Sequence, residues 1–160
     1  MMAQNDLPPD PAIVGPQWRQ MWLDRIAANE PWSHIWMAHQ CRDAYWQQGS
    51  ICEDFSKIQI PVYAVSGWAD NYSESIPRLL ANLTAPRLGL IGPWAHSFPH
   101  DVTVQPAMCW LAEALRWFDH WLKGADTGVM AEPMLRVWMQ GAVPPQTCYT
   151  TRPGRWVSYA

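Results

Sequence analysis

Two stretches in the first third of the chain have the apolar spacing of an α-helix. The first begins at Gln17 and the second at Pro31, because proline is favoured in the first turn of a helix. Their apolar positions are Trp18, Met21, Trp22 and Ile26 in the first stretch, and Trp32, Ile35, Trp36, Ala44 and Tyr45 in the second. We expect these helices to form an antiparallel hairpin, and the proline-rich residues 1–16 before them to run extended.

The pattern changes at residues 58–66, where the sequence is β-branched and almost continuously apolar. Such a run is typical of a strand buried on both faces, as in a parallel sheet that helices cover. A short helical segment over 76–83 and a second apolar run over 87–91 follow. Strand, helix and strand at this spacing predict a βαβ unit with a right-handed crossover.

The clearest helix is predicted over 106–123, with Pro106 at its start and Gly124 directly after its end. We expect a single buried stripe made of Ala107, Trp110, Leu111, Ala114, Leu115, Phe118, Trp121 and Leu122. The solvent-facing side would then carry Glu113, Arg116, Asp119 and Lys123. Beyond Gly128, residues 134–139 alternate like a half-exposed strand, and the change in pattern near 130 indicates a domain boundary.

The composition excludes several classes of protein. Only 16% of residues are charged and the net charge is −3, so a nucleic-acid binder that neutralises phosphates is not expected. Apolar residues reach 49%, but no uninterrupted run could span a membrane. The four cysteines form no C-x-x-C pair, and the first residues lack the basic start and apolar core of a signal peptide, which together favour a cytoplasmic protein. The 12 tryptophans indicate large aromatic surfaces, most of them packed in a core.

Each predicted strand is followed by a loop that carries a titratable residue. Asp70 lies after the first strand and His96 after the second. The carboxyl ends of neighbouring parallel strands share one edge of a sheet, so the two side chains can meet there. A carboxylate on one imidazole nitrogen fixes the tautomer and leaves the other nitrogen free to accept a proton. The alternative is that Asp70 caps the following helix and His96 is an ordinary loop histidine.

Several segments, taken together, resemble the cocaine esterase and X-Pro dipeptidyl-peptidase family of serine hydrolases. The segment Gly67-Trp68-Ala69-Asp70, followed by residues 77–80, is similar to the family's acid region, and Gly92-Pro93-Trp94-Ala95-His96 is similar to its histidine motif. Residues 115–124 resemble its last core helix, residues 42–46 the end of an inserted helical cap, and residues 132–138 the entry into a C-terminal jelly-roll domain. The resemblance implies that Asp70 and His96 are the acid and the base of a catalytic triad.

The chain departs from this family at the nucleophile. No G-x-S-x-G elbow is present, because Ala64 and Trp68 stand where glycines would flank Ser66. The resemblance therefore implies the second half of a larger α/β-hydrolase. Its expected parts are part of a helical cap over 1–55, the C-terminal part of the α/β core over 56–131, and the beginning of a β-sandwich (jelly roll) over 132–160.

The activity implied is hydrolysis of an ester or amide (peptide) bond in a small-molecule ester or a short peptide. The chain would supply Asp70 and His96 but no serine, and would need no metal or organic cofactor. An isolated piece of sheet with a bare edge should self-associate or require the missing N-terminal half. The alternative function is a truncated, non-catalytic hydrolase-like module that acts in interactions or is inactive.

Two further features could contribute to a site. Trp68 and Trp94 stand beside the two loops, and aromatic side chains commonly line ligand pockets, so we consider both as substrate contacts. A metal site at His96 and His100 is not expected, because Pro99 between them prevents the regular helix that would place both on one face.

Overall fold

The structure is a computed structural model, and it describes residues 7–160. The chain divides into two compact units, one ending at Ser50 and the other running from Ile51 to Ala160. Residues 1–6, on which part of the signal-peptide argument rests, lie outside the described residues.

The first unit is a series of short helices. They are α2 (Pro11–Val14), the 3-10 turn η1 (Gly15–Gln17), α3 (Trp18–Ala28), α4 (Trp32–Ala38) and α5 (Ala44–Gln48). The prediction of an extended segment over 1–16 is wrong at its end, because Pro11 takes the first position of α2 and Asp10 accepts a hydrogen bond from the N–H of Ala12 as its N-cap. The predicted antiparallel hairpin is also wrong, since α3 and α4 do not pack along one another and neither contains a buried residue.

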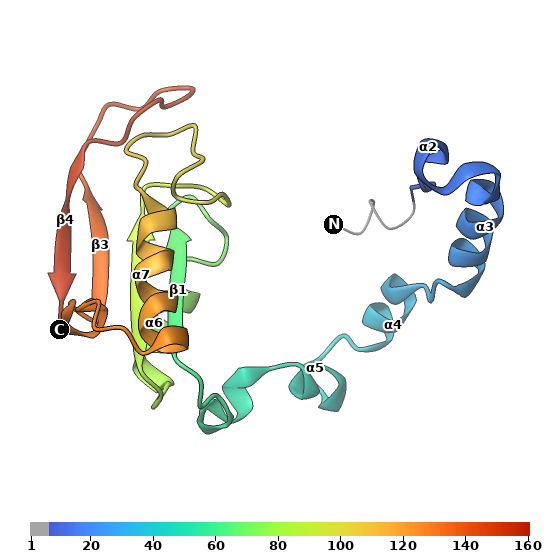
Figure 1. Cartoon of the computed structure of the whole chain (residues 1–160), viewed down its shortest axis with the longest axis horizontal. Helices are drawn as coiled ribbons and strands as arrows, with labels where there is room; N and C mark the ends of the chain where they lie inside the picture. The colour runs from blue at the N-terminus through green and yellow to red at the C-terminus, as the bar shows by residue number, and fades with distance from the viewer. Residues whose placement is uncertain (1–6) are drawn as a thin grey trace. The chain divides into compact units, whose positions relative to one another are not determined.

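The second unit is built on a four-stranded sheet in the order β1-β2-β3-β4 (Figure 1). After the 3-10 turns η2 (Ile51–Glu53) and η3 (Phe55–Lys57) come β1 (Val62–Gly67), α6 (Ser75–Asn82), β2 (Arg87–Gly92), α7 (Trp110–Lys123), η4 (Val129–Ala131), β3 (Leu135–Gln140) and β4 (Gly154–Tyr159). β1 and β2 pair in parallel with α6 between them, so the predicted βαβ unit is confirmed. β3 pairs in parallel with β2, and β4 pairs antiparallel with β3.

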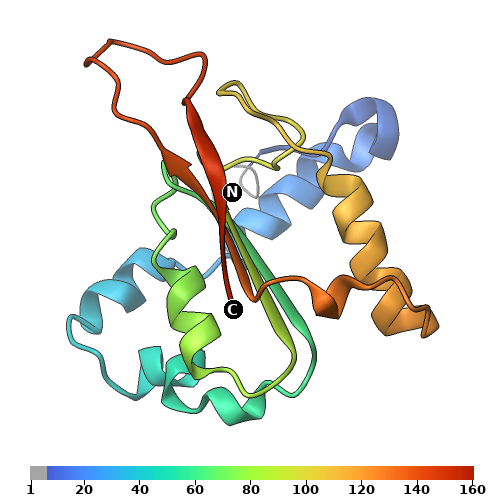
Figure 2. The same cartoon turned by 90° about the vertical axis from the view of Figure 1, so that its left-hand side faces the viewer.

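The two helices cover opposite faces of this sheet, as Figure 2 shows with α6 and α7 on either side of the strands. Neighbouring residues of a strand point to opposite faces. Accordingly, Ala64 of β1 packs with Ile76 and Leu80 of α6, whereas Tyr63 packs with Trp117 of α7. This two-sided cover explains why β1 is apolar at nearly every position.

The last two strands continue this sheet. β3 is hydrogen-bonded to β2, so residues 132–160 belong to the same compact unit as the βαβ element. The sequence pattern alone suggested a boundary near 130, but the buried Val137 places the middle of β3 in the core beneath α6. The onset of a jelly roll stays a prediction.

Helix α7 begins at Trp110, four residues later than predicted, and its orientation differs from the predicted one. Trp117 is buried against Leu88, but Leu111, Leu115, Phe118 and Leu122 are all more than half exposed. The prediction of one broad buried stripe is therefore wrong for these four residues. Glu113, expected in solvent, instead faces the sheet, where its side chain is only 16% exposed.

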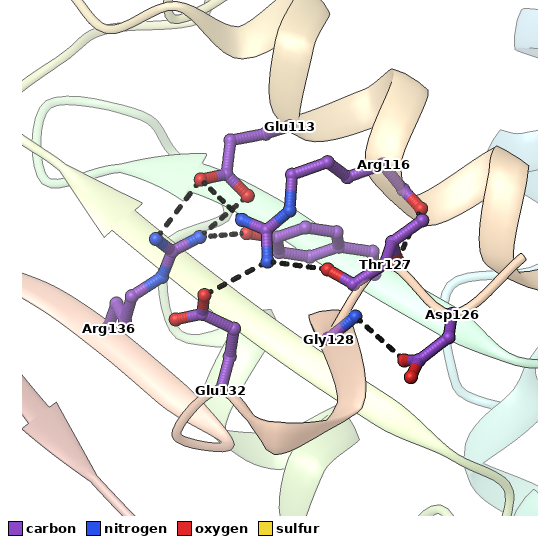
Figure 3. A network of polar contacts seen from close by, with 8 residues as sticks. Glu113, Arg116, Asp126, Thr127, Gly128, Glu132 and Arg136 are labelled. Carbon is purple, nitrogen blue, oxygen red and sulfur yellow. Dashed lines mark hydrogen bonds and ion pairs between the residues drawn. The ribbon is translucent and has the colours of Figure 1, made fainter.

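A network of charged side chains fixes this orientation (Figure 3). Arg136 of β3 donates two hydrogen bonds to the Glu113 carboxylate, with nitrogen–oxygen distances of 3.2 and 3.1 Å, and a third to the Tyr63 hydroxyl at 2.5 Å. Arg116 contacts Glu132 at 3.1 Å. Burial lowers the pKa of Arg136, but its bonds to Glu113 and Tyr63 outweigh burial and raise it, so the guanidinium stays charged. The network ties α7 to β1, to β3 and to the segment before β3.

Replacing Arg136 by methionine should destabilise the unit by about 2–4 kcal/mol, because it leaves the Glu113 carboxylate without its partner at a site largely closed to water. Urea denaturation would measure this loss. The matched control is Lys123→Met, which removes an ion pair to Asp119 from a side chain that is 70% exposed and should cost about 1 kcal/mol or less. Adding Glu113→Gln to Arg136→Met should restore part of the stability. A double variant less stable to urea than Arg136→Met alone would contradict this explanation.

None of the helices described over residues 7–160 has both the length and the apolar character needed to cross a membrane.

Candidate active site

The candidate site lies where β1 and β2 end. The parallel register pairs Gly67 directly with Gly92, so both loops leave the sheet at the same level. Backbone hydrogen bonds continue beyond the strands, from the Trp68 N–H to the Gly92 carbonyl at 2.9 Å and from the Ala69 N–H to the Trp94 carbonyl at 3.0 Å. The loops that carry Asp70 and His96 are therefore held together by the backbone itself.

This close approach depends on glycine. A Cβ atom at Gly67 would lie 2.0 Å from the carbonyl oxygen of Trp94, and one at Gly92 would lie 2.4 Å from the Trp94 ring. The first of these obstacles is backbone, which no side-chain rotation can relieve. Gly67 is thus required by the distance between the two loops.

Gly67→Ala should cost about 3 kcal/mol or more in the free energy of unfolding, because the histidine loop must move to admit the methyl group. Urea denaturation gives the free energy, and the NMR signals of His96 report whether its contact with Asp70 survives. Gly49→Ala is the control, since a Cβ atom there meets nothing within 4 Å and Gly49 has a φ of −91°. Equal stability of the two variants would show that the loops are not held as closely as described.

The structure brings Asp70 and His96 together. Oδ2 of Asp70 lies 3.0 Å from Nδ1 of His96. The other carboxylate oxygen of Asp70, Oδ1, accepts a hydrogen bond from the Tyr72 N–H at 3.1 Å. Asp70 does not cap α6, which begins at Ser75. One of its oxygens shapes the loop and the other contacts the imidazole.

The electrostatics define which atom carries the proton. Burial raises the pKa of Asp70, but the hydrogen bonds with the Tyr72 N–H and with His96 outweigh burial and lower it. An ionised carboxylate can only accept, so Nδ1 of His96 must donate. Nε2 of the neutral ring then holds a free lone pair.

The two members of the pair differ in exposure. The Asp70 side chain is 11% exposed, whereas that of His96 is 79% exposed. Within the described part of the chain, Nε2 of His96 has no hydrogen-bond partner. The pair is thus an anchored carboxylate beneath an imidazole whose reactive nitrogen is open to another molecule.

The two tryptophans have different positions. Trp94 is 1% exposed, and its Nε1–H donates to the Pro106 carbonyl at 2.7 Å, so it packs the base of the histidine loop and presents no open surface. Trp68 is 46% exposed, although its Nε1–H is bonded to the Trp138 carbonyl at 2.8 Å. As a substrate contact, Trp68 stays a prediction, and Trp94 is a structural support in this arrangement.

Sequence reasoning missed Tyr72. Its ring centroid lies 6.3 Å from that of His96, edge to face, and its backbone N–H holds Asp70. The local signal was an aspartate two residues before it, the spacing of an Asx-turn. Among residues 7–160, no group of three or more histidine, cysteine, aspartate or glutamate side chains is arranged to hold a metal ion.

Comparison with known proteins shows the family to which the chain belongs. The family model of the X-Pro dipeptidyl-peptidase (S15 family) matches residues 3–98, a range that includes both Asp70 and His96. The chain is also 32% identical over 96 residues to the proteins named "Putative serine esterase Mb1866c" of Mycobacterium bovis and "Putative serine esterase MT1883" of Mycobacterium tuberculosis. Each alignment covers 56% of this chain but only 14% of the relative, so the chain spans a small part of those proteins. The chain belongs to the X-Pro dipeptidyl-peptidase (S15) family of hydrolases.

Proposed function

We propose that the chain supplies the acid and the base of a serine-hydrolase triad, Asp70 and His96, to a nucleophilic serine outside this sequence. The observation that carries the proposal is the contact of 3.0 Å between Asp70 Oδ2 and His96 Nδ1, with Nε2 open to solvent. The reaction is hydrolysis of an ester or amide bond in a small ester or short peptide, in keeping with the serine esterases and the peptidase family that the chain resembles.

The proposed steps follow from the protonation state of the pair. Nε2 of His96 takes the proton from the serine hydroxyl as its oxygen attacks the carbonyl carbon, and the imidazolium that forms is stabilised by Asp70. His96 then gives that proton to the leaving alcohol or amine, which departs from the acyl-enzyme. In the second half, His96 deprotonates water, which releases the acid and regenerates the serine. Every proton that His96 accepts is returned within the cycle.

The serine is placed elsewhere because the serines near the dyad do not fit the role. Ser66 lies in β1 with its Oγ buried. Ser75 is the first residue of helix α6, after the N-cap Glu74, and Ser73 and Ser97 lie in loops. None of them stands on the sharp turn between a strand and a helix that exposes a nucleophile in this fold.

The competing function is a non-catalytic module. The lack of a serine on a strand–turn–helix elbow in this sequence also favours this second function. In that case the Asp70–His96 contact would only stabilise the two loops. The DNA upstream of the first codon discriminates between these functions, since an open frame encoding a serine elbow would favour the enzyme.

Activity provides the direct test. The chain would be co-expressed with the part of the Mycobacterium tuberculosis relative that precedes its aligned segment, and assayed with p-nitrophenyl acetate and an X-Pro p-nitroanilide. We expect hydrolysis and labelling by a serine-directed fluorophosphonate only when both polypeptides are present. If the chain alone hydrolyses the ester, and His96→Ala abolishes that activity, then the nucleophile lies within the chain and the proposal is wrong.

A further inference from the structure

Two loops carry the Asp70–His96 pair, the acid loop over 68–74 and the histidine loop over 93–109. They begin side by side at the ends of β1 and β2, where backbone hydrogen bonds join them. Beyond that point the histidine loop leaves the sheet, and the side chain of His96 is 79% exposed. An exposed imidazole on a long loop keeps a fixed contact with a carboxylate only where the rest of the loop is anchored.

The far end of the histidine loop is anchored to the segment that leads into β4. Gln105 forms an isolated parallel bridge with Thr151. Its N–H donates to the Thr150 carbonyl at 2.9 Å, and its carbonyl accepts from the Arg152 N–H at 2.8 Å. The loop between β3 and β4 thus runs beside the histidine loop (Figure 1). We call residues 150–152 the strap.

Trp138 of β3 joins the strap to the acid loop. Its indole Nε1–H donates to the Arg152 carbonyl at 3.0 Å. The indole lies against Gly154, where a Cβ atom would be 2.7 Å from Nε1. The backbone carbonyl of Trp138 accepts from the Trp68 Nε1–H at 2.8 Å. A continuous path of hydrogen bonds therefore runs from the acid loop through Trp138 and the strap to Gln105.

The rings of three tryptophans connect Trp138 with the start of the histidine loop. Trp138 meets Trp156 of β4 edge to face, with 5.3 Å between the ring centroids, and Trp156 lies 6.2 Å from Trp94. Trp94 stands two residues before His96, and its Nε1–H donates to the Pro106 carbonyl at 2.7 Å. Both ends of the histidine loop are thus linked to Trp138.

We propose that Trp138 is a positioning residue for the Asp70–His96 pair, because its carbonyl holds the acid loop and its indole holds the strap that anchors the histidine loop. This inference rests on the proposed function, in which the pair acts as acid and base. Proton transfer depends on placement within about 1 Å, so a path that fixes both loops bears directly on the rate. Trp138 itself takes no part in the proton transfer.

The full-length chain with nitrogen-15-labelled histidine tests this placement without any activity. The neutral His96 ring of the wild type should carry its proton on Nδ1, because the Asp70 carboxylate accepts from that atom. Trp138→Phe keeps the carbonyl and much of the ring but removes the Nε1–H. We expect the Nδ1–H signature of His96 to be partly lost in this variant, with the Nε2–H form appearing beside it.

Trp121→Phe is the matched control. Trp121 Nε1 is buried and has no hydrogen-bond partner within residues 7–160, so the same deletion should leave the His96 signals unchanged. Trp68→Phe cuts the path at its other bond, on a side chain that is 46% exposed, and should disturb the His96 signals as Trp138→Phe does. The urea midpoint of each variant verifies folding, and Trp68→Phe decides the question if Trp138→Phe does not fold.

The reconstituted hydrolase supplies the second measurement. Trp138→Phe should lower kcat about 10- to 100-fold with little change in KM, because the loops lose their placement and the substrate contacts stay. Wild-type His96 signals in the folded Trp138→Phe and Trp68→Phe variants would show that the path does not hold the pair. An equal disturbance in Trp121→Phe would likewise overturn the proposal, since any lost indole N–H would then act in the same way. If the His96 signals change as expected but the wild-type complex hydrolyses neither substrate, the positioning role stands and the proposed function is wrong.

Discussion

His96→Ala is expected to lower kcat of the reconstituted hydrolase by about 10⁴-fold or more, with little change in KM. The variant removes Nε2 of His96, the atom that the Asp70 contact leaves open to take the serine proton. The fold should survive, because the His96 side chain is 79% exposed and contributes little packing. Steady-state kinetics on p-nitrophenyl acetate gives the rate, and the urea midpoint verifies folding.

Two other histidines provide controls for this experiment. His100 follows His96 in the same loop and is also exposed, so His100→Ala tests whether any change in that loop lowers the rate. His39 forms a second histidine–aspartate pair, with Nδ1 2.6 Å from Asp43 Oδ2, in the first unit. We expect both variants to keep kcat within a few-fold of the wild type. A loss of 10³-fold or more in His39→Ala would indicate that the wrong pair has been assigned.

The strands and the meeting of the two loops could be predicted from the sequence because the signals are local. Residues 58–66 are almost continuously apolar, which is typical of a strand that pairs in parallel beneath helices, although the strand itself begins only at Val62 and Ile60 before it is 71% exposed. The register that places Gly67 beside Gly92 then brings Asp70 to His96 without any long-range information. The pattern also located the helix between the strands.

The orientation of α7 could not be predicted, because its apolar residues form two adjoining rows. Periodicity assigned Leu115 and Phe118 to the buried stripe and left Trp117 out of it, because the pattern does not indicate which of the two rows faces the sheet. The choice is made by Arg136, which lies 23 residues beyond Glu113 and draws that side of the helix onto β3. An ion pair between distant elements leaves no trace in a local pattern.

The burial of Trp94 was missed for a related reason. Gly67 and Gly92 leave a space that only becomes visible once the strands are paired, and the indole fills it against Gly92. Asp70 illustrates the opposite case. Its Oδ2 contacts the imidazole, as the sequence led us to expect, whereas its Oδ1 holds the loop at Tyr72 and does not cap α6.

Asp70→Asn is expected to lower kcat about 10⁴-fold while leaving the loops in place. Asparagine can keep the bond from the Tyr72 N–H, but its amide can donate to Nδ1 and so stabilise the tautomer that carries the proton on Nε2. That nitrogen could then no longer act as a base. Asp43→Asn is the matched control, because Asp43 also accepts from a histidine and from a backbone N–H, and the pKa of its carboxyl is likewise lowered, chiefly by the His39 hydrogen bond.

The stability of the folded chain at acid pH tests the Asp70 carboxylate independently of activity. Because the pKa of Asp70 is lowered in the folded chain, its contribution to stability is present above the ordinary aspartate value of about 3.9. It is lost as the pH falls through the lowered folded value. Asp70→Asn should therefore flatten the pH dependence of the urea midpoint below about pH 4, relative to the wild type. If that dependence were unchanged and kcat fell less than tenfold, Asp70 would be only a loop residue, and the imidazole would have to be oriented by another group.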